Sequence, residues 1–589
     1  MSGLIGVVAH DGRSAVPEQE LESLVRTYVV RRGASPVRHV AAGKWARFAQ
    51  FGGAADDRAS NGSSSWAIHA GALHTACRLA DARLDELEGQ FAGVRYRTDG
   101  DVLEVFNDPF GMQQFYCASQ ADRTYVSTSA SALAAHLDAP VNEDGVRLYL
   151  RTGKQLGTIT LWHGIERLDP ATVLSFGPRG RTSSTYWRPA VDPAVRSMSL
   201  ARTIDYVTEV CIFTVERWFD TNDCIWADLT GGYDSRLVNA LLTRAGIEFR
   251  ANTAGEEETV DVRIAREVAS AGGLQWQHER LPPGWRLERD QLQEAVGWGD
   301  GTLDVLLLAE VLWRQRERRR SYPVVVNGGG GEHLGPMPWS QEFNRAGRSR
   351  DVNLDNFMRM RMLPPVPAGA LRAELVDDVE AFCREYSRDV FLHRAKPYHE
   401  ELNTSQLDMM YVYRAVSHFG AFRSAFDAHI RTELPFYFKD IFGAGFSAHH
   451  RWRNGHRLHR GVIERLSPRL SAVATERGGP AQPFRLTNAH RFLPYYTRLA
   501  RTAVRKIRGT RAPAAPMPVS QASAYALSIQ ELRGEGVFDP QSMRTGSLYD
   551  PEALERMVQH AATPGFRDWT QLGRIATLEL TVRNTGSAS

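Results

Sequence analysis

The chain has 589 residues, of which 43% are hydrophobic and 24% charged, and its formal net charge is +3. This length exceeds that of one ordinary domain, so we expect two or three domains with substantial cores. The near-neutral charge argues against a nucleic-acid-binding protein. No apolar run is long enough to span a membrane, and the N-terminal "MSGLIGVVAHDG" lacks an export signal. We therefore expect no transmembrane segment and a cytoplasmic protein.

The first part of the chain is rich in short strands. Between residues 3 and 129, segments such as "GLIGVVAH" and "VLEVFND" are separated by turn residues. From about residue 200 the pattern changes to helices that alternate with apolar strands. Strands are predicted at 225–229, 249–253, 274–279 and 324–326, and helices at 259–271 and 303–315. Such alternation is typical of a parallel sheet covered by helices.

The rest of the chain is predicted to be mainly helical. Residues 405–468 have a helical pattern, and "RAPAAPMPVSQASA", at 511–524, is predicted to be a loop before a helical tail. The cysteines have neither paired nor metal-binding spacing, so we interpret them as reduced thiols in the core. They are Cys77, Cys117, Cys211, Cys224 and Cys383.

The stretch "CIWADLTGGYDSRLVNALLTRAG", at 224–246, joins a predicted strand to an amphipathic helix through two glycines and Asp234. Glycines after a strand let backbone N–H groups approach an anion, and the next helix points its positive end at the same place. A lone carboxylate there would repel phosphate. A bound Mg²⁺ removes the conflict, because it joins the carboxylate to phosphate oxygens. The alternative interpretation is an ordinary strand-to-helix turn.

Several motifs, in order along the chain, resemble those of one family. Thr230 to Ser235, "TGGYDS", resembles the SGGxDS pyrophosphate loop of ATP-pyrophosphatase enzymes. "VVVNGGGGEHLG", at 324–335, resembles the second loop, SGEGxDE, of the asparagine-synthetase-like family. "NTAGEEETVDVRIAREVA" resembles the adenine-side strand and helix of that family, and "RTELPFYFKD" its R-x-P-F-L-D segment. "LEGQFAGVRYRTDGDVLEVFNDPFGMQQFYCAS" resembles the end of its glutaminase-like domain, so the likeness covers about residues 1 to 480.

The resemblance implies an α/β fold with three parts. Residues 1–195 would form a glutaminase-like αββα sandwich of the Ntn type. Residues 196–510 would form an ATP-pyrophosphatase domain with a parallel sheet, similar to adenine nucleotide alpha hydrolases. Residues 511–589 would form a loop and a helical C-terminal tail.

The resemblance also implies a chemistry. Family members adenylate a carboxylate with ATP and Mg²⁺, release pyrophosphate, and let an amine attack to form an amide. Asp234 and Glu332 would then hold the metal. The other residues implied in nucleotide binding are Thr230, Gly231, Gly232 and Ser235 at the phosphates, and Leu229, Thr253 and Gly328 at the adenosine.

Two departures concern the glutaminase half. Ser2 stands where the family has the cysteine that attacks glutamine, and a hydroxyl is a weak nucleophile without a tuned base. Ala70, Gly71 and Ala72 replace the family's glutamine-binding Asn-Gly-Glu. We therefore expect the domain to be catalytically silent and the amine to come from another source. That arrangement is similar to β-lactam synthetases and lasso-peptide cyclases.

Three further residues are candidates for catalysis. The family often has Glu or Tyr at the third position of the second loop, where this chain has Gly329. His333 and Tyr413 are alternative general bases on pKa grounds. The region that resembles the family's segment with a late lysine contains no lysine, and Arg477 is the nearest candidate; it would act by charge alone because a guanidinium keeps its proton. Each also has a structural interpretation: a loop histidine bonded to backbone, a core tyrosine, and a solvated arginine.

The most specific hypothesis is macrolactam closure of a lasso-type peptide, with a peptide or small-molecule carboxylate as substrate and a precursor peptide or leader protease as partner. The alternatives are intermolecular ligation with a small amine or ammonia, and a degenerate ATP-binding scaffold. An RNA-modifying enzyme is disfavoured by the charge. Two basic runs, 314–320 and 498–511, are interpreted as solvated helix faces; the second could instead receive an acidic peptide, a carrier protein or anionic lipid.

Overall fold

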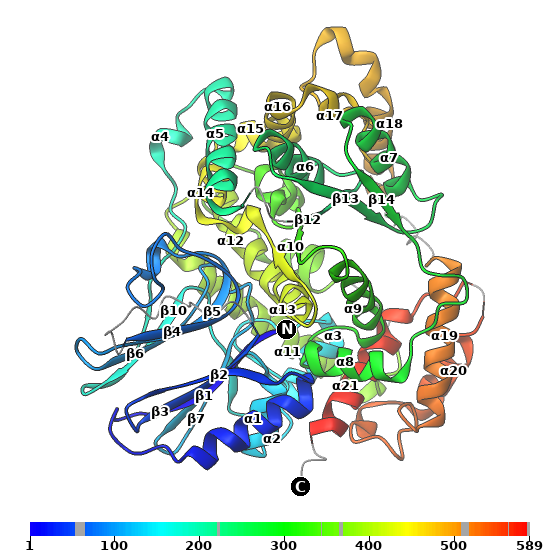
Figure 1. Ribbon diagram of the computed structural model, residues 1–589. Coiled ribbons are helices and arrows are strands. Elements are labelled where there is room, and N and C mark those ends of the chain that lie inside the picture. Colours follow the sequence, from blue (N-terminus) through cyan, green and yellow to red (C-terminus); the bar gives the residue numbers. More distant parts are fainter. Residues whose placement is uncertain are drawn as a thin grey trace.

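A computed structural model describes residues 1–52, 65–220, 224–342, 344–364, 369–507, 517–563 and 565–585. Figure 1 shows the N-terminal strands at the lower left, the parallel sheet above them, and the C-terminal helices at the right. None of the helices within these ranges is both long and apolar enough to cross a membrane.

The N-terminal part is a sandwich of two antiparallel sheets, as predicted. The first has the strand order β2-β3-β1-β8-β7-β9, and the second β11-β10-β6-β5-β4. Helices α1 (Glu18–Arg32) and α2 (Ala130–Leu137) pack on the first sheet. The strands are β1 (Ser2–Ala9), β2 (Pro36–Ala42), β3 (Ala46–Gly52), β4 (Trp66–His74), β5 (Glu88–Arg97), β6 (Val102–Asn107), β7 (Tyr116–Gln120), β8 (Arg123–Ser127), β9 (Ile165–Arg167), β10 (Thr172–Gly177) and β11 (Gly180–Thr185).

The second sheet system is parallel and has the order β14-β13-β12-β15-β16. Its strands are β12 (Ile225–Asp228), β13 (Phe249–Ala254), β14 (Trp276–Glu279), β15 (Val324–Val326) and β16 (Arg431–Glu433). The helices around it include α5 (Leu200–Trp218), α6 (Asp234–Arg244), α7 (Val260–Gly272) and α16 (Arg457–Leu466). The predicted strands and the predicted helix at 259–271 are confirmed. Since the central strand β12 leads directly into α6, its loop opens at the edge where parallel strands end and ligands bind.

A helical layer joins the two sheet systems. It includes α8 (Arg289–Gly299), α9 (Val305–Arg319), α12 (Asn403–Ala415) and α13 (Ala421–Phe426), so the predicted helical character of 405–468 is confirmed. The tail adds α19 (Val519–Gly534), α20 (Pro551–His560) and α21 (Trp569–Thr585). The predicted loop at 511–524 is therefore wrong from Val519 onward, and residues 508–516 lie outside the described residues. Its alanines and serines are compatible with a helix, and Pro518 stands just before it.

The cysteines are only partly as predicted. All five are free thiols. Cys117, Cys211 and Cys383 are buried, but Cys77 and Cys224 are exposed, so the prediction of a core position is wrong for these two. Cys224 directly precedes β12, before the strand enters the core.

Buried polar contacts hold the N-terminal sandwich to the rest of the molecule. Asp300, after α8, forms an ion pair of 2.5 Å with Arg32 and accepts a hydrogen bond from the Ser129 hydroxyl at 2.8 Å. His74 contacts the carboxylate of Glu433 at 3.2 Å. The first of these contacts joins the sandwich to the helical layer, and the second joins it to β16 of the parallel sheet.

Candidate active site

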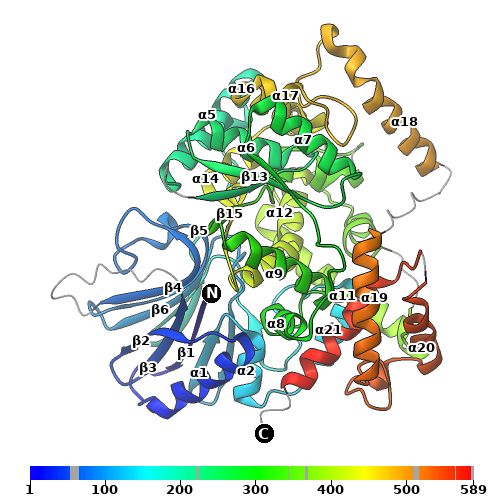
Figure 2. The same cartoon turned by 45° about the vertical axis from the view of Figure 1, so that its right-hand side comes forward.

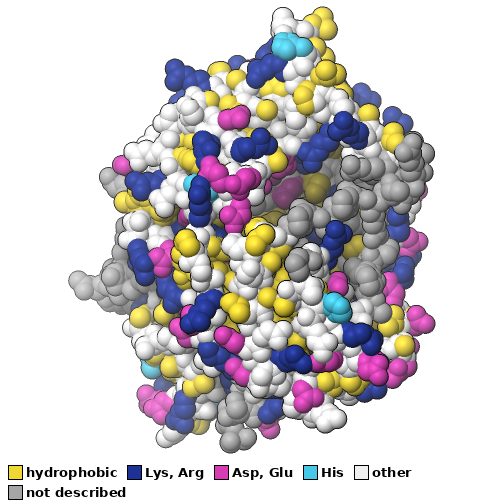
Figure 3. All heavy atoms as spheres, turned by 90° about the vertical axis from the view of Figure 1, so that its right-hand side faces the viewer, with side chains coloured by type: hydrophobic (Ala, Val, Ile, Leu, Met, Phe, Trp, Pro, Cys, Tyr) yellow, Lys and Arg dark blue, Asp and Glu magenta, His cyan; other side chains and the backbone are white. Residues whose placement is uncertain are grey.

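A cavity of about 690 Å³ opens at the carboxyl ends of β12, β13 and β15. It brings together residues that are far apart in the sequence, as the motifs predicted. Of the predicted nucleotide and metal residues, Leu229, Thr230, Asp234, Ser235, Thr253, Gly328 and Glu332 line it. On the face of the molecule in Figure 3 the surface is hollowed, and acidic side chains gather beside the hollow.

The loop between β12 and α6 is held by its own hydrogen bonds. The Ser235 hydroxyl accepts from the Thr230 backbone at 3.0 Å, and the Thr230 hydroxyl accepts from Gly232 at 3.2 Å. Gly231 donates its N–H to Asp261 at 2.9 Å. The glycine N–H groups predicted for phosphate are thus engaged within the protein in this structure. An anion would meet the N-terminal end of α6 as its main donor.

The two glycine-rich loops lie in direct contact. A Cβ on Gly331 would lie 2.6 Å from Cγ of Asp234, and one on Gly328 would lie 2.7 Å from the Ser235 nitrogen. Only glycine fits this approach. Burial, and next the neighbouring Asp234 carboxylate, raise the pKa of Glu332 to about 7. Asp234 and Glu332 therefore face the same small space.

His459 on α16 is a neighbour of the site that the sequence did not reveal. Its Nε2 lies 2.8 Å from Oδ1 of Asp234, and its ring is fully buried. Asp234 keeps 31% of its side-chain surface exposed, so the contact leaves room for a ligand. In "GHRLHR" the spacing of His456, His459 and Arg460 puts them on one helix face, which was the available signal.

Two residues of the basic run at 314–320 point into the protein. The prediction that this run is a solvated helix face is therefore wrong for Arg314 and Arg318. Arg314 and Arg318 line the cavity from α9. Arg314 pairs with Glu310 at 2.9 Å. Arg318 pairs with Asp228 at 3.2 Å and with Glu279 at 2.9 Å. The turn-by-turn spacing of Arg314 and Arg318 places both on the side of α9 that faces β13.

The charges around the cavity suit a divalent cation with a polyphosphate. The lining carboxylates are Asp228, Asp234, Glu256, Asp261, Glu310 and Glu332. Only two lining guanidinium groups oppose them, and both already have acidic partners. No group of three His, Cys, Asp or Glu residues within the described ranges is arranged to hold a metal. Mg²⁺ typically takes one or two carboxylates and completes its shell with phosphate oxygens and water, which fits Asp234 and Glu332.

The two candidate bases lie elsewhere. His333 is 3% exposed, its Nδ1 contacts the Gly330 carbonyl, and its ring packs 4.7 Å from that of Phe442. Burial lowers its pKa to about 3. Tyr413 lies under the N-terminal sandwich, where its hydroxyl donates to Asp169 at 3.3 Å. The structure brings neither residue into the cavity. His333 is a loop histidine that contacts the backbone, and Tyr413 is a buried tyrosine with a bonded hydroxyl, as the alternative interpretation of each predicted.

Arg477 lies behind the loop between β12 and α6. The preceding residue, Glu476, donates its N–H to the Gly231 carbonyl at 3.0 Å. The Arg477 guanidinium contacts His456 at 2.8 Å and lines a neighbouring cavity. The backbone at Glu476 therefore contacts the loop, whereas the Arg477 side chain lines the neighbouring cavity and not the candidate active site.

Ser2 is partly buried, and its hydroxyl is engaged by the segment that replaces the family's glutamine-binding residues. Its hydroxyl accepts a hydrogen bond from the Gly71 N–H at 3.0 Å. A Cβ on Gly71 would lie 2.6 Å from Gln113 Oε1 and 3.2 Å from Arg423 Nη2. Arg423 comes from α13, in the other half of the molecule, and pairs with Asp427 at 2.8 Å. A side chain of the second half thus reaches the position next to Ser2.

Comparisons with known proteins agree with the motifs. Residues 72–187 match a family model described as a glutamine amidotransferase domain. Asparagine synthetase [glutamine-hydrolyzing] 1 of Bacillus subtilis is 21% identical over 266 residues, which cover 44% of this chain and 42% of that protein. A putative asparagine synthetase of Mycobacterium bovis is 25% identical over 260 residues, 43% of this chain and 40% of that protein. The chain thus matches about two fifths of the length of these relatives, and its predicted resemblance to the asparagine-synthetase-like family is confirmed.

Among solved structures, a glutamine phosphoribosylpyrophosphate amidotransferase from B. subtilis is 12% identical and covers 47% of this chain and 65% of its own. The TM-score is 0.21, and a score this low does not establish a shared fold.

Proposed function

We propose that the protein is an ATP-dependent amide ligase that activates a carboxylate as its adenylate. The observation that carries the proposal is the contact of two acidic, glycine-rich loops at the carboxyl edge of a parallel sheet, where Asp234 and Glu332 face one space. Similarity to asparagine synthetases supports the same chemistry.

In this proposal the residues divide the work. Asp234 and Glu332 hold Mg²⁺, which would neutralise the negative charge of the phosphates. The N-terminal end of α6 binds a phosphate through its N–H groups. His459 packs against Asp234, with its Nε2 2.8 Å from the carboxylate, and so limits the positions that the carboxylate can take. Leu229, Thr253 and Gly328 form the wall for the adenosine.

The amine comes from the substrate or from a second substrate. Two observations support this: Ser2 and Ala70 to Ala72 replace the family's attacking cysteine and glutamine-binding residues, and the Ser2 hydroxyl already accepts a hydrogen bond from Gly71. The finer proposal is that the substrate is a peptide or amino-acid-derived carboxylate. Closure of a lasso-type macrolactam would be its most specific form.

Nucleotide binding and pyrophosphate exchange test the proposal. The binding of Mg²⁺ with α,β-methylene-ATP is measured by calorimetry for the wild type, for Asp234→Asn, and for Asp99→Asn, a control at an exposed position. We expect Asp234→Asn to weaken binding at least about tenfold, or about 1.4 kcal/mol, because one metal ligand loses its charge. The control should bind as the wild type does.

Exchange of labelled pyrophosphate into ATP is then followed with pools of amino acids and short peptides. Exchange that requires Asp234 would support the ligase. Nucleotide binding without exchange in every pool would favour the degenerate scaffold. Unchanged nucleotide binding in Asp234→Asn would refute the site itself.

A further inference from the structure

A second cavity, of about 1250 Å³, opens behind the loop between β12 and α6. One wall is α18 (Leu493–Ile507) with the segment before it. The other walls come from the start of α5, the segment around residue 342, and the turn before α16. In Figures 1 and 2, α18 projects at the upper edge of the molecule. Because the side chains of Tyr496 and Leu499 line the cavity and are about half exposed, the cavity is open to solvent on this side, and we call it the groove.

One side of this groove is basic. Arg345, Arg457, Arg460 and Arg477 line it. Arg345 and Arg457 are exposed and form no ion pair with any described residue. The one lining carboxylate, Glu342, is 5% exposed and accepts a backbone hydrogen bond from Asn353 at 2.7 Å. Arg477 is paired with Glu476 at 3.8 Å, so the uncompensated positive charge that the groove presents to a ligand comes mainly from Arg345 and Arg457.

The opposite side is apolar and uncovered. Leu499 and Tyr496 of α18 are 54% and 49% exposed, and Phe484 is 48% exposed. All three line the groove. Tyr496 and Leu499 lie on one side of α18, whose other residues include Arg498 and Arg501, and Phe484 lies in the segment before the helix. A ligand that carries both acidic and apolar groups would match the two walls.

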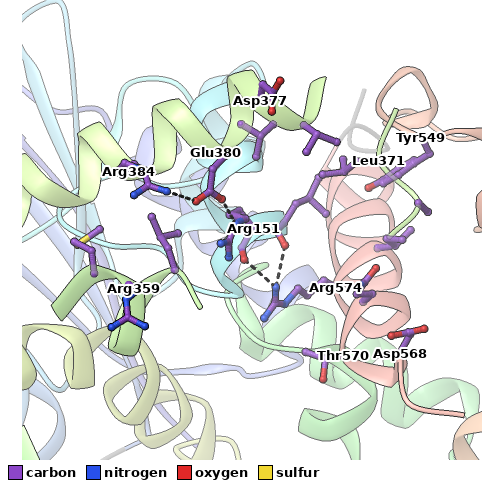
Figure 4. Close-up of a pocket in the computed structure, with 18 of the residues that line it drawn as sticks. Arg151, Arg359, Leu371, Asp377, Glu380, Arg384, Tyr549, Asp568, Thr570 and Arg574 are labelled. Atoms are coloured by element: carbon purple, nitrogen blue, oxygen red, sulfur yellow. Dashed lines mark hydrogen bonds and ion pairs between the residues drawn. The ribbon is translucent and has the colours of Figure 1, made fainter. Parts of the chain in front are cut away.

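The groove is longer than a small anion needs. Asn353 and Asn356 line it and also line a further cavity of about 1110 Å³. Figure 4 shows this further cavity, in which Glu380 points toward both Arg151 and Arg384. These charges are already paired, at 2.5 and 3.0 Å. The two cavities thus have Asn353 and Asn356 as common wall residues, and the volume of the groove alone exceeds that of an ordinary small-molecule pocket, which suits a larger ligand such as a peptide.

The groove is also connected to the candidate active site. Arg460 donates to the hydroxyl of Tyr233, in the loop before α6, at 3.0 Å, and His456 stacks on the Tyr233 ring at 4.6 Å. Glu476 bonds to Gly231 in the same loop. A ligand in the groove would contact residues that hold this loop.

We propose that the groove binds an acidic peptide with interspersed apolar residues. That this peptide carries the carboxylate to be activated rests on the proposed ligase function, whereas the binding itself does not. The peptide would place its acidic side chains on the arginine wall and its apolar side chains on α18.

The test uses the full chain and a short fluorescein-labelled peptide in which glutamate alternates with leucine. Fluorescence anisotropy is measured for the wild type and for Arg345→Glu/Arg457→Glu, both at exposed positions. The matched control is Arg26→Glu/Arg38→Glu, which has the same change of charge on the N-terminal sandwich. We expect roughly tenfold weaker binding for the first double variant, and wild-type affinity for the control.

Two further arms separate the possible outcomes. The variant Leu499→Ala/Tyr496→Ser should lower the affinity for the same peptide several-fold while its circular dichroism spectrum stays unchanged. A peptide in which lysine alternates with leucine should not bind.

Equal affinity of all variants for the glutamate peptide, or equal binding of the lysine peptide, would overturn the proposal. So would arginine-dependent binding of phosphatidylglycerol vesicles without binding of the peptide, which would identify a membrane surface. If the wild-type protein binds the peptide but does not bind Mg²⁺ with α,β-methylene-ATP, the proposal of a peptide-binding groove stands and the proposed ligase function is contradicted.

Discussion

Single residues decide whether the two loops of the candidate site can meet. The glycines and acids of both loops were visible in the sequence, because each lies directly after an apolar strand. The partners from other elements were not. His459 and Arg318 reach the site from helices whose facing depends on the tertiary packing, and one sequence gives no register between such helices.

Gly328→Ala should separate the loops. The added Cβ would lie 2.7 Å from the Ser235 nitrogen and 2.9 Å from the Asp234 carbonyl carbon, and these backbone atoms have no freedom to turn aside. We expect Mg²⁺-nucleotide affinity to fall by about tenfold or more. The control is Gly443→Ala in α14 (Lys439–Ser447), where a Cβ meets open space and should stabilise the helix by about 0.5–1 kcal/mol. Equal affinities by calorimetry would contradict the tight contact.

His418 should make the fold sensitive to acid. Burial, and next Lys154 and Arg414, lower its pKa from 6.5 to about 4. Between these pH values the unfolded chain binds a proton that the folded chain does not, so stability falls as the pH drops from 6.5 toward 4. His418→Phe keeps an aromatic ring beside Phe422 and should flatten this part of the curve of melting temperature against pH. Identical curves for both proteins would exclude this contribution.

At the scale of elements, the local pattern was enough for most of the parallel sheet but not for its edge or its surroundings. Strands β12 to β15 lie where the sequence predicted them, whereas the edge strand β16, with the sequence Arg-Thr-Glu, has no apolar run and was not predicted. The start of α19 was predicted to be a loop, yet Pro518, Ser520 and Gln521 form one wall of the cavity at the candidate active site. Small and polar residues gave no sign that long-range contacts would select a helix there.

Tyr525→Phe tests the attachment of α19. The buried Tyr525 hydroxyl donates to Glu310 of α9 at 3.0 Å, beside Gln521, which donates to the same oxygen at 2.7 Å. Loss of the hydroxyl should cost about 1–2 kcal/mol in urea unfolding, because a buried carboxylate loses a donor. In Tyr322→Phe no described partner is lost, and the change should stay within about 0.5 kcal/mol. A similar small effect in both variants would mean that α19 is held by its apolar face alone.

For the whole molecule, the sequence predicted two sheet systems but not how they are joined. The joint depends on isolated polar residues such as Asp300, whose partners Arg32 and Ser131 lie in the other half. No motif marks them, since a single Asp next to Gly resembles any turn. The groove that Arg345 and Arg457 line likewise depends on how α5, α18 and the segment around residue 342 come together, which no local pattern shows.

Asp300→Asn should loosen this joint. Asn tolerates the left-handed backbone at this position (φ 47°), so the main effect is to leave the buried Arg32 without a counter-charge. We expect a loss of about 3 kcal/mol in denaturant unfolding. The double variant Asp300→Asn/Arg32→Met should recover part of that loss. Strictly additive effects would show that the two side chains act independently.

The final helix, α21, has a consequence for how the protein is made. Leu578 and Val582 belong to the hydrophobic core of the N-terminal sandwich, together with Leu4 and Phe48. The N-terminal strands are synthesised first, but their hydrophobic core is complete only after α21, near the end of the chain, has been translated. A nascent chain, or a truncated variant that ends before α21, would expose the apolar surface that α21 covers. We expect such a chain to aggregate unless a chaperone binds it.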